Sequence, residues 1–172
     1  MVDDWIDKLA IRDVLERYMR YNDDGALDRI VELFDTDARY QVVGRVLRGH
    51  DEIRAFLAGN GFADGRPQWT DPGELLKQPR SMHVSSNPII DVDGDEATAE
   101  SEFVVLGRDE QGHARITLAG RYRDRLRKIE GRWLIITRTG VSLARPGDER
   151  TDVEWQRALT RMDERERKNL EL

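Results

Sequence analysis

Apolar side chains recur at helical spacing in the first third of the chain. Residues 4–21 repeat them at i and i+4 along two neighbouring rows, which predicts an amphipathic helix. The polar segment NDDG at 22–25 interrupts this pattern, and residues 26–34 resume it as a second, shorter helix. Residues 37–44, DARYQVVG, alternate as a strand does, and residues 49–59, GHDEIRAFLAG, form a third helical pattern.

The pattern changes in the middle of the chain. Residues 61–79 are rich in glycine and proline, which is typical of a long loop. Beyond them, apolar and polar residues alternate with period two in four segments, which are separated by turns at 93–94 (Asp-Gly), 109–112 (DEQG) and 130–131 (Glu-Gly). This spacing predicts a four-strand antiparallel meander, with the early strand at one edge of the sheet. Helices followed by such a meander make an α+β domain.

One domain accounts for most of the chain. Its 172 residues can bury a single core, and the regular patterns lie within residues 1–146. More than half of residues 147–172 are charged, so we expect them to form an exposed helical extension. The residues expected to anchor this extension are Val153, Trp155 and Leu159.

Composition and charge exclude several classes of function. The chain has no cysteine, so disulfides, thiolate metal sites and a cysteine nucleophile are absent. A net charge of −6 argues against nucleic acid as the main partner, because phosphate binding needs concentrated positive charge. No apolar run approaches the ~20 residues of a membrane helix, and the acidic start MVDDWIDKLA lacks the pattern of a secretion signal. We therefore expect a cytoplasmic protein.

Three segments carry a family resemblance: LFDTDARY, GHDEIRAFL and GRYRDRLRKIEGRWLI, in that order within residues 5–145. They resemble the SnoaL-like branch of the nuclear transport factor 2-like superfamily. The resemblance implies a cone-shaped, strongly curved, mostly antiparallel sheet that three N-terminal helices wrap around a pocket, here with an extra C-terminal helix. Residues 1–146 would then be a SnoaL-like α+β barrel domain. This fold hosts enzymes, binding modules and assembly subunits, so it does not by itself give a function.

The resemblance also implies a pair of catalytic residues, Asp23 in RYMRYNDD and His83 in MHVSSNP. A neutral imidazole is a useful base at physiological pH, and a carboxylate on its other nitrogen fixes the tautomer. Tyr18, just over one turn before Asp23, is expected to polarise a substrate oxygen. Asp24 is an alternative partner, because the helix end is uncertain by a residue. In the competing interpretation the histidine satisfies a backbone group and the aspartate is a turn residue.

Two catalytic residues of related enzymes are missing from this sequence, and their absence reduces the number of candidate reactions. The steroid isomerases of the superfamily carry a basic aspartate at a position that falls at about Val42 here. The two-histidine dehydratases carry a second histidine on the strand after the hairpin, whereas His113 lies beyond that strand in a turn. What remains is the single Asp–His type of the polyketide cyclases, bile-acid-type dehydratases and dehydrochlorinases, which share proton abstraction.

The expected pocket is mostly apolar, with few polar groups. Strand parity turns Tyr122 and Asp124 to one face and the arginines between them to solvent. Arg138 would share a face with Leu134 and Ile136, and would pair with Asp124 or meet an anionic substrate group. For each aromatic residue a role in the core is favoured over substrate contact. The candidate substrate-binding residues are Tyr40, Val42, Trp69, Phe103 and Arg138.

No nucleotide fingerprint or metal-ligand spacing occurs, so we expect chemistry without a cofactor or metal. The first hypothesis is a lyase or isomerase, dehydratase- or cyclase-like, acting on a small hydrophobic substrate as a homodimer or homotrimer. The alternative follows from SMHVSSNPIIDV, GRYRDRLRK and GRWLIITRTGVSL, which also resemble the β subunits of aromatic-ring-hydroxylating dioxygenases. Such a subunit is non-catalytic and assembles with a Rieske-type α subunit. A small-molecule-binding module is the third possibility.

Overall fold

A computed structural model describes most of the chain. The helical extension expected at 147–172 and the candidate substrate-binding residue Trp69 lie outside the described residues. The described residues are 3–42, 45–59, 82–108 and 111–143.

Three helices precede the four-strand meander, as the apolar periodicity predicts. Helix α1 spans Asp3–Asp24, α2 spans Leu27–Val31 and α3 spans Gly49–Gly59. Helix α1 runs through most of the segment that was expected to interrupt it. The side-chain amide of Asn22 donates to the carbonyl of Tyr18 (2.7 Å), and the chain turns only at Gly25, whose φ of 65° suits glycine.

Six strands form one mixed sheet in the order β2-β1-β6-β5-β4-β3. The meander β3–β6 and its hairpin turns are confirmed. The expectation that the early strand lies at an edge is wrong, because β1 pairs in parallel with β6 and the short β2 forms that edge. The strands are β1 Phe34–Val42, β2 Arg45–Arg48, β3 Met82–Asp93, β4 Glu96–Arg108, β5 Ala114–Ile129 and β6 Arg132–Ser142.

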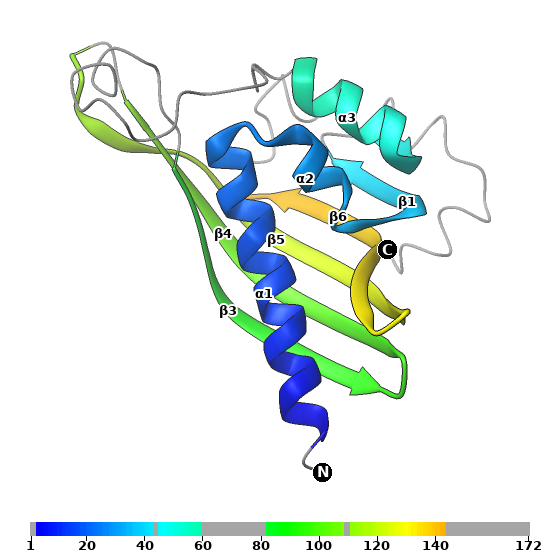
Figure 1. Ribbon diagram of the computed structural model, residues 1–172. Coiled ribbons are helices and arrows are strands. Elements are labelled where there is room, and N and C mark those ends of the chain that lie inside the picture. The colour runs from blue at the N-terminus through cyan, green and yellow to red at the C-terminus, as the bar shows by residue number, and fades with distance from the viewer. Residues whose placement is uncertain (1–2, 43–44, 60–81, 109–110, 144–172) are drawn as a thin grey trace.

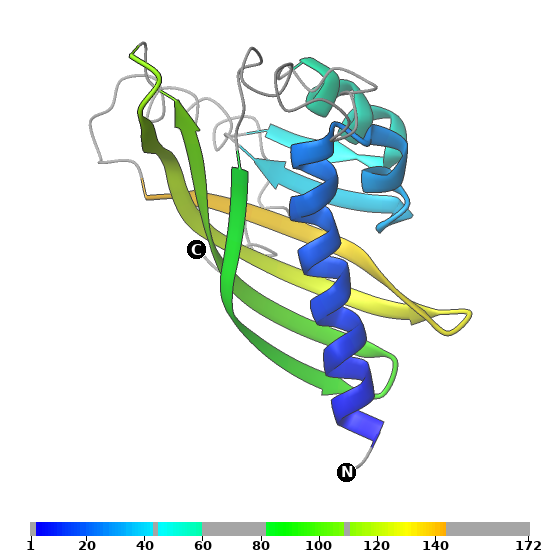
Figure 2. The same ribbon diagram turned by 60° about the vertical axis from the view of Figure 1, so that its left-hand side comes forward.

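The sheet is strongly curved and α1 runs along one of its faces, while α2 and α3 lie beside β1 (Figure 1, Figure 2). We call the face toward α1 the inner face. Among the described strands no pairing joins β2 to β3, so the sheet is open and does not close as a barrel. The alternation predicted for β4 and β5 is confirmed. The inner-face residues of these strands are Ala97, Ala99, Ser101, Phe103, Val105, Gly120, Tyr122, Asp124 and Leu126.

Gly120 allows a close approach inside the sheet. A Cβ atom there would lie 2.1 Å from the carbonyl oxygen of Val141 and 2.7 Å from the ring of Phe103. Because glycine has no Cβ, Phe103 can occupy this space and stack on Tyr122, with ring centroids 4.4 Å apart. The glycine therefore helps to place two aromatic rings of the inner face.

A β-bulge in β6 changes the expected surroundings of Arg138. Arg125 pairs with Thr137 and Leu126 pairs with Ile135, which leaves Ile136 as an extra residue. One inserted residue reverses the alternation beyond it. Arg138 therefore shares the inner face with Ile135 and not with Ile136 or Leu134, which corrects the prediction from strand parity.

Candidate functional site

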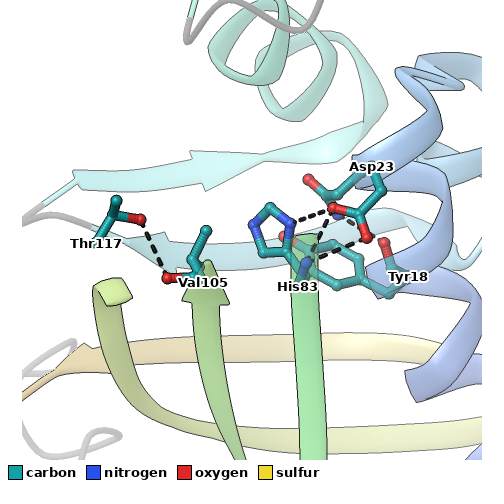
Figure 3. A network of polar contacts seen from close by, with 6 residues as sticks. Tyr18, Asp23, His83, Val105 and Thr117 are labelled. Carbon is teal, nitrogen blue, oxygen red and sulfur yellow. Dashed lines mark hydrogen bonds and ion pairs between the residues drawn. The ribbon is translucent and has the colours of Figure 1, made fainter. Parts of the chain in front are cut away.

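The strand β3 begins beside the C-terminal end of α1, and this arrangement brings His83 to Asp23 (Figure 3). The ring Nδ1 of His83 lies 2.8 Å from Oδ1 of Asp23. The backbone N–H of His83 donates to both oxygens of the same carboxylate, at 3.0 and 3.1 Å. Asp24, the other candidate partner, is exposed at the end of the helix. Two residues sixty positions apart are thus held together by both backbone and side chain.

This geometry determines which ring nitrogen of His83 carries a hydrogen. An ionised carboxylate can only accept hydrogen bonds, so the Nδ1 that faces Asp23 must be the protonated nitrogen. The lone pair is then on Nε2, which lies on the side of the ring away from Asp23 (Figure 3). The side chains of His83 and Asp23 are 13% and 15% exposed. His83 is therefore oriented as a base that is neither fully buried nor fully solvated.

The end of α1 adds a second electrostatic influence. The last turn of a helix carries partial negative charge from its unpaired carbonyl groups, and α1 has no basic residue in its last turn. Asp23 lies in this turn. An imidazolium formed by proton uptake at His83 would be stabilised by the carboxylate and by this end of the helix.

Tyr18 lies on the same helix but turns into the core. Its side chain is 2% exposed, and its hydroxyl donates to the hydroxyl of Tyr40 at 2.9 Å. Burial, and then the neighbouring hydroxyl groups of Tyr122 and Tyr18, raise the pKa of Tyr40 well above its ordinary value of 10.0, so Tyr40 stays neutral. In this arrangement Tyr18 donates its hydroxyl hydrogen to Tyr40 and not outward. The role of Tyr18 as a donor to a substrate stays a prediction.

Arg138 forms the buried ion pair with Asp124 that was one of its two expected roles. Its Nε and Nη2 donate to the two carboxylate oxygens at 2.7 and 2.8 Å, and both side chains are 0% exposed. Its guanidinium lies 4.0 Å from the ring centroid of Tyr18 and 4.5 Å from that of Tyr122. Burial opposes the charge of Arg138, but the charge and hydrogen bonds of Asp124 outweigh this effect and raise the pKa of Arg138.

Two polar atoms of the inner face have no hydrogen-bond partner within the described part of the chain: Nη1 of Arg138 and Oγ of Ser101. Ser101 is not among the candidate residues that the sequence analysis singled out. The signal was a single hydroxyl in the otherwise apolar row of alternate residues along β4. Buried unpaired polar atoms are uncommon, so these two distinguish this part of the interior from an ordinary apolar core.

The other candidate binding residues contribute to packing. Phe103 and Tyr40 are buried and belong to the aromatic cluster around Tyr18. Val42 is partly buried against the core. His113 is exposed beyond β4, away from the inner face. The structure thus brings His83 and Asp23 together, and it places Tyr18, Tyr40, Phe103 and Arg138 in one buried cluster.

The described residues contain no group of three or more histidine, aspartate or glutamate side chains arranged to hold a metal ion. None of the helices in this part of the chain is long and apolar enough to cross a lipid bilayer.

Comparison with known proteins agrees with this architecture. The model of the SnoaL-like domain family matches residues 4–139, which is most of the chain. The chain belongs to the SnoaL-like family. A comparison with curated protein sequences finds no match for this SnoaL-like protein.

Solved structures of similar shape include three proteins of Novosphingobium aromaticivorans. A nuclear transport factor 2-like protein with a cystatin-like fold has a TM-score of 0.70 and 23% identity, covering 89% of this chain and 91% of that chain. A candidate scytalone dehydratase has a TM-score of 0.65 and 23% identity, with coverages of 84% and 89%. The β subunit of a candidate aromatic-ring-hydroxylating dioxygenase has a TM-score of 0.66 and 22% identity, with coverages of 86% and 97%. At these identities the likeness establishes the fold alone.

Proposed function

We propose that this SnoaL-like protein is a lyase or isomerase that removes a proton from a small hydrophobic substrate, with His83 as the base. The observation that carries the proposal is the 2.8 Å contact between Nδ1 of His83 and Asp23. It leaves Nε2 as the acceptor and places a negative charge where the imidazolium forms. The reaction needs no cofactor, because the substrate supplies both the proton and the leaving group.

A dehydration requires two proton transfers at His83. Nε2 of His83 takes a proton from a carbon next to a carbonyl group, and the electrons of that C–H bond form the new double bond. The hydroxyl group on the neighbouring carbon takes a proton from the imidazolium and leaves as water. For an isomerisation the imidazolium returns the proton to another carbon instead.

Asp23 is the positioning residue in this proposal. It holds the His83 ring and its tautomer through the ring nitrogen and the backbone N–H, without touching the substrate. The candidate scytalone dehydratase of similar fold makes dehydration a natural first reaction to test. We also propose Tyr18 as the hydrogen-bond donor to a substrate oxygen and Arg138 as a substrate-binding residue; both side chains belong to the buried cluster.

The test is a screen of β-hydroxy carbonyl compounds with steroid, terpenoid and aromatic polyketide frameworks, with loss of water followed by mass spectrometry. The variants His83→Gln and Asp23→Asn should lower any turnover by about 10²–10⁴-fold. Asp24→Asn is the matched control, because its carboxylate is exposed at the same helix end, and it should keep the wild-type rate. Turnover that survives His83→Gln would contradict the proposed base.

A second candidate is the β subunit of a ring-hydroxylating dioxygenase, with a Rieske-type α subunit as partner. It is supported by the fold shared with such a subunit from Novosphingobium aromaticivorans. In that case the Asp23–His83 contact joins α1 to β3 and has no chemical role. Co-expression with a Rieske-type subunit separates the two candidates, because only the second forms a stable complex that survives His83→Gln.

A further inference from the structure

Residues of three neighbouring strands form one row on the inner face beside the candidate base. His83 of β3 pairs with Val105 of β4, and Val105 pairs with Leu118 of β5. Residues directly opposite each other on antiparallel strands point to the same face of a sheet, so Leu118 lies on the inner face with the other two. Neighbouring strands are about 5 Å apart, which places Leu118 roughly 10 Å from His83 along this row.

Leu118 is far more exposed than the other large apolar residues of this part of the sheet. Its exposed fraction is 44%, whereas Val105, Tyr122 and Leu126 on the same face are 7%, 6% and 2% exposed. The covering of the inner face is thus incomplete at the row that contains His83. Leu118 offers an apolar surface there that an ordinary core position would not leave uncovered.

A β-bulge in β5 ends this apolar row. Val105 pairs with Leu118 and Leu106 pairs with Ile116, so Thr117 is an extra residue. The insertion turns Ile116 to the opposite face of the sheet, although it is only two positions from Leu118. The hydroxyl of Thr117 donates to the carbonyl of Val105 at 3.1 Å, which holds the bulge in place (Figure 3). Leu118 is therefore the last large apolar residue of β5 on the inner face.

Gly107 makes room for the bulge. A Cβ atom at Gly107 would lie 2.7 Å from the methyl carbon of Thr117, so any larger residue would push this side chain away. Because the hydroxyl of Thr117 is bonded to the backbone, its methyl group adds to the apolar surface next to Val105. We call Val105, Thr117 and Leu118 the apolar platform.

We propose that the apolar platform binds the ring framework of the substrate, and that Leu118 determines how large a framework is accepted. The inference rests on the proposed function, because it takes His83 as the base. The Nε2 side of the His83 ring is directed away from Asp23, toward Val105 and Thr117 (Figure 3). A substrate whose reactive carbon lies at Nε2 therefore extends over the apolar platform.

The size and chemistry of the apolar platform favour a framework of at least two fused rings. From His83 to Leu118 the row spans two inter-strand distances, roughly 10 Å. A single ring held at Nε2 reaches Val105 and leaves Leu118 uncovered, whereas a fused-ring framework covers both and gains affinity with the apolar area that it buries. A sugar or a nucleotide would find no partners for its polar groups on this surface.

The first experiment measures the affinity of two probes, 2-naphthol with two fused rings and phenol with one, from the NMR shifts of the His83 ring. Leu118→Ala should weaken the binding of 2-naphthol by about 10-fold and that of phenol by less than ~2-fold, because only the larger probe reaches Leu118. Leu118→Glu, at a position exposed enough to tolerate the charge, should weaken the binding of 2-naphthol further. Ile116→Ala is the matched control, since Ile116 lies on the same strand, is 64% exposed and points to the opposite face.

Three results would overturn the proposal. They are a wild type that does not bind 2-naphthol, a Leu118→Ala variant that keeps the affinity of the wild type, and an Ile116→Ala variant that loses as much affinity as Leu118→Ala. Urea unfolding gives the reason for the second result. If Leu118→Ala lowers the free energy of unfolding and leaves the affinity unchanged, Leu118 packs against the chain itself and not against a ligand.

The second experiment separates this inference from the assignment of the base. On a fused-ring substrate found in the screen, Leu118→Ala should raise KM by about 10-fold and change kcat by less than ~2-fold, whereas His83→Gln lowers kcat. If 2-naphthol binding depends on Leu118 but turnover survives His83→Gln, only the proposed function is wrong. If His83→Gln abolishes turnover and Leu118→Ala leaves KM unchanged, only the role of the apolar platform is wrong.

Discussion

Two carboxylates of this chain, one paired with an arginine and one with a histidine, differ in their burial and in the elements that they join. Asp124 and Arg138 face each other on neighbouring strands and are 0% exposed. Asp23 and His83 join the end of α1 to the start of β3 and are 15% and 13% exposed. Arginine keeps its charge at all accessible pH values, so the first pair is a permanent ion pair. The second pair is partly exposed, and in it Nδ1–H of a neutral imidazole donates to the carboxylate.

The buried Asp124–Arg138 pair is expected to matter for the stability of the fold, whereas the partly exposed Asp23–His83 pair is the candidate for chemistry. A buried pair contributes little net stability relative to apolar residues, but losing one partner leaves an uncompensated charge in the core. A partly exposed pair costs less to break, and its geometry matters more for the histidine tautomer than for the fold. Substitutions in the two pairs should therefore separate stability from activity.

The largest effect is expected from Arg138→Met. It leaves the Asp124 carboxylate buried without its partner, and we expect a loss of ~3–5 kcal/mol in the free energy of unfolding. Urea unfolding followed by circular dichroism measures it. The double variant Arg138→Met with Asp124→Leu should recover much of this loss, because both charges are then gone. If Arg138→Met alone is as stable as the wild type, then leaving the Asp124 carboxylate without its partner costs no stability, which contradicts the prediction.

Asp23→Asn should leave the fold largely intact, because its carbonyl oxygen can still accept the backbone N–H of His83. We expect a stability change of about 1 kcal/mol. The carboxamide can also donate, so it no longer forces the hydrogen of His83 onto Nδ1. Long-range ¹⁵N–¹H NMR spectra distinguish the two tautomers, and the wild type should show the Nδ1–H form. An Nδ1–H form that persists in Asp23→Asn would mean that Asp23 does not select the tautomer.

A third pair, Asp7 with Lys128, joins α1 to β5, and its side chains are 15% and 32% exposed. Lys128 and the indole N–H of Trp133 both donate to Oδ1 of Asp7 at 2.8 Å, and these hydrogen bonds lower the pKa of Asp7 below its ordinary value of 3.8. A lowered folded-state pKa gives stability that is present above pH 3.8 and is lost as the pH falls through the folded-state value. The stability difference between the wild type and Asp7→Asn should therefore shrink as unfolding is measured from pH 7 towards pH 3. A difference independent of pH would show that the ionised form is not favoured by folding.

The smallest effect is expected for Arg12 and Glu16, which pair one turn apart on α1 at 2.9 Å and are more than half exposed. Arg12→Ala should change the stability by less than ~0.5 kcal/mol, and added salt should remove most of that difference. Urea unfolding at two salt concentrations measures it. A larger, salt-resistant loss would indicate a packing role for the arginine stem.

The local elements could be predicted from the sequence because their signals are local. The period of 3.6 located α1 and α3, and the Asp-Gly and Glu-Gly turns located two hairpins, with Gly94, Glu130 and Gly131 at positive φ. The place of β1 could not be predicted, since its parallel partner β6 is far along the chain. The bulge at Ile136 was also hidden, because one extra residue does not disturb an apolar run.

The candidate site, too, could be predicted only in part, because its contacts join residues far apart in the sequence. Asp23 and His83 are sixty residues apart, so only the family resemblance suggested their contact, and their role in catalysis is still a prediction. The pairing of Arg138 with Asp124 followed from the rule that a buried charge needs a partner. The hydrogen bond between Tyr18 and Tyr40 had no signal in the sequence, because both residues match ordinary core positions.

The parallel pairing of β1 with β6 also has a consequence for synthesis on the ribosome. Phe34 is aligned with Ile135, so roughly a hundred residues separate the two partners. At about 5–20 residues per second, β1 waits roughly 5–20 s for β6 to be made. During that time one edge of β1 offers unpaired backbone groups to neighbouring nascent chains. Early aggregation of this protein should therefore begin on polysomes, and slower translation of the segment between β1 and β6 should increase it.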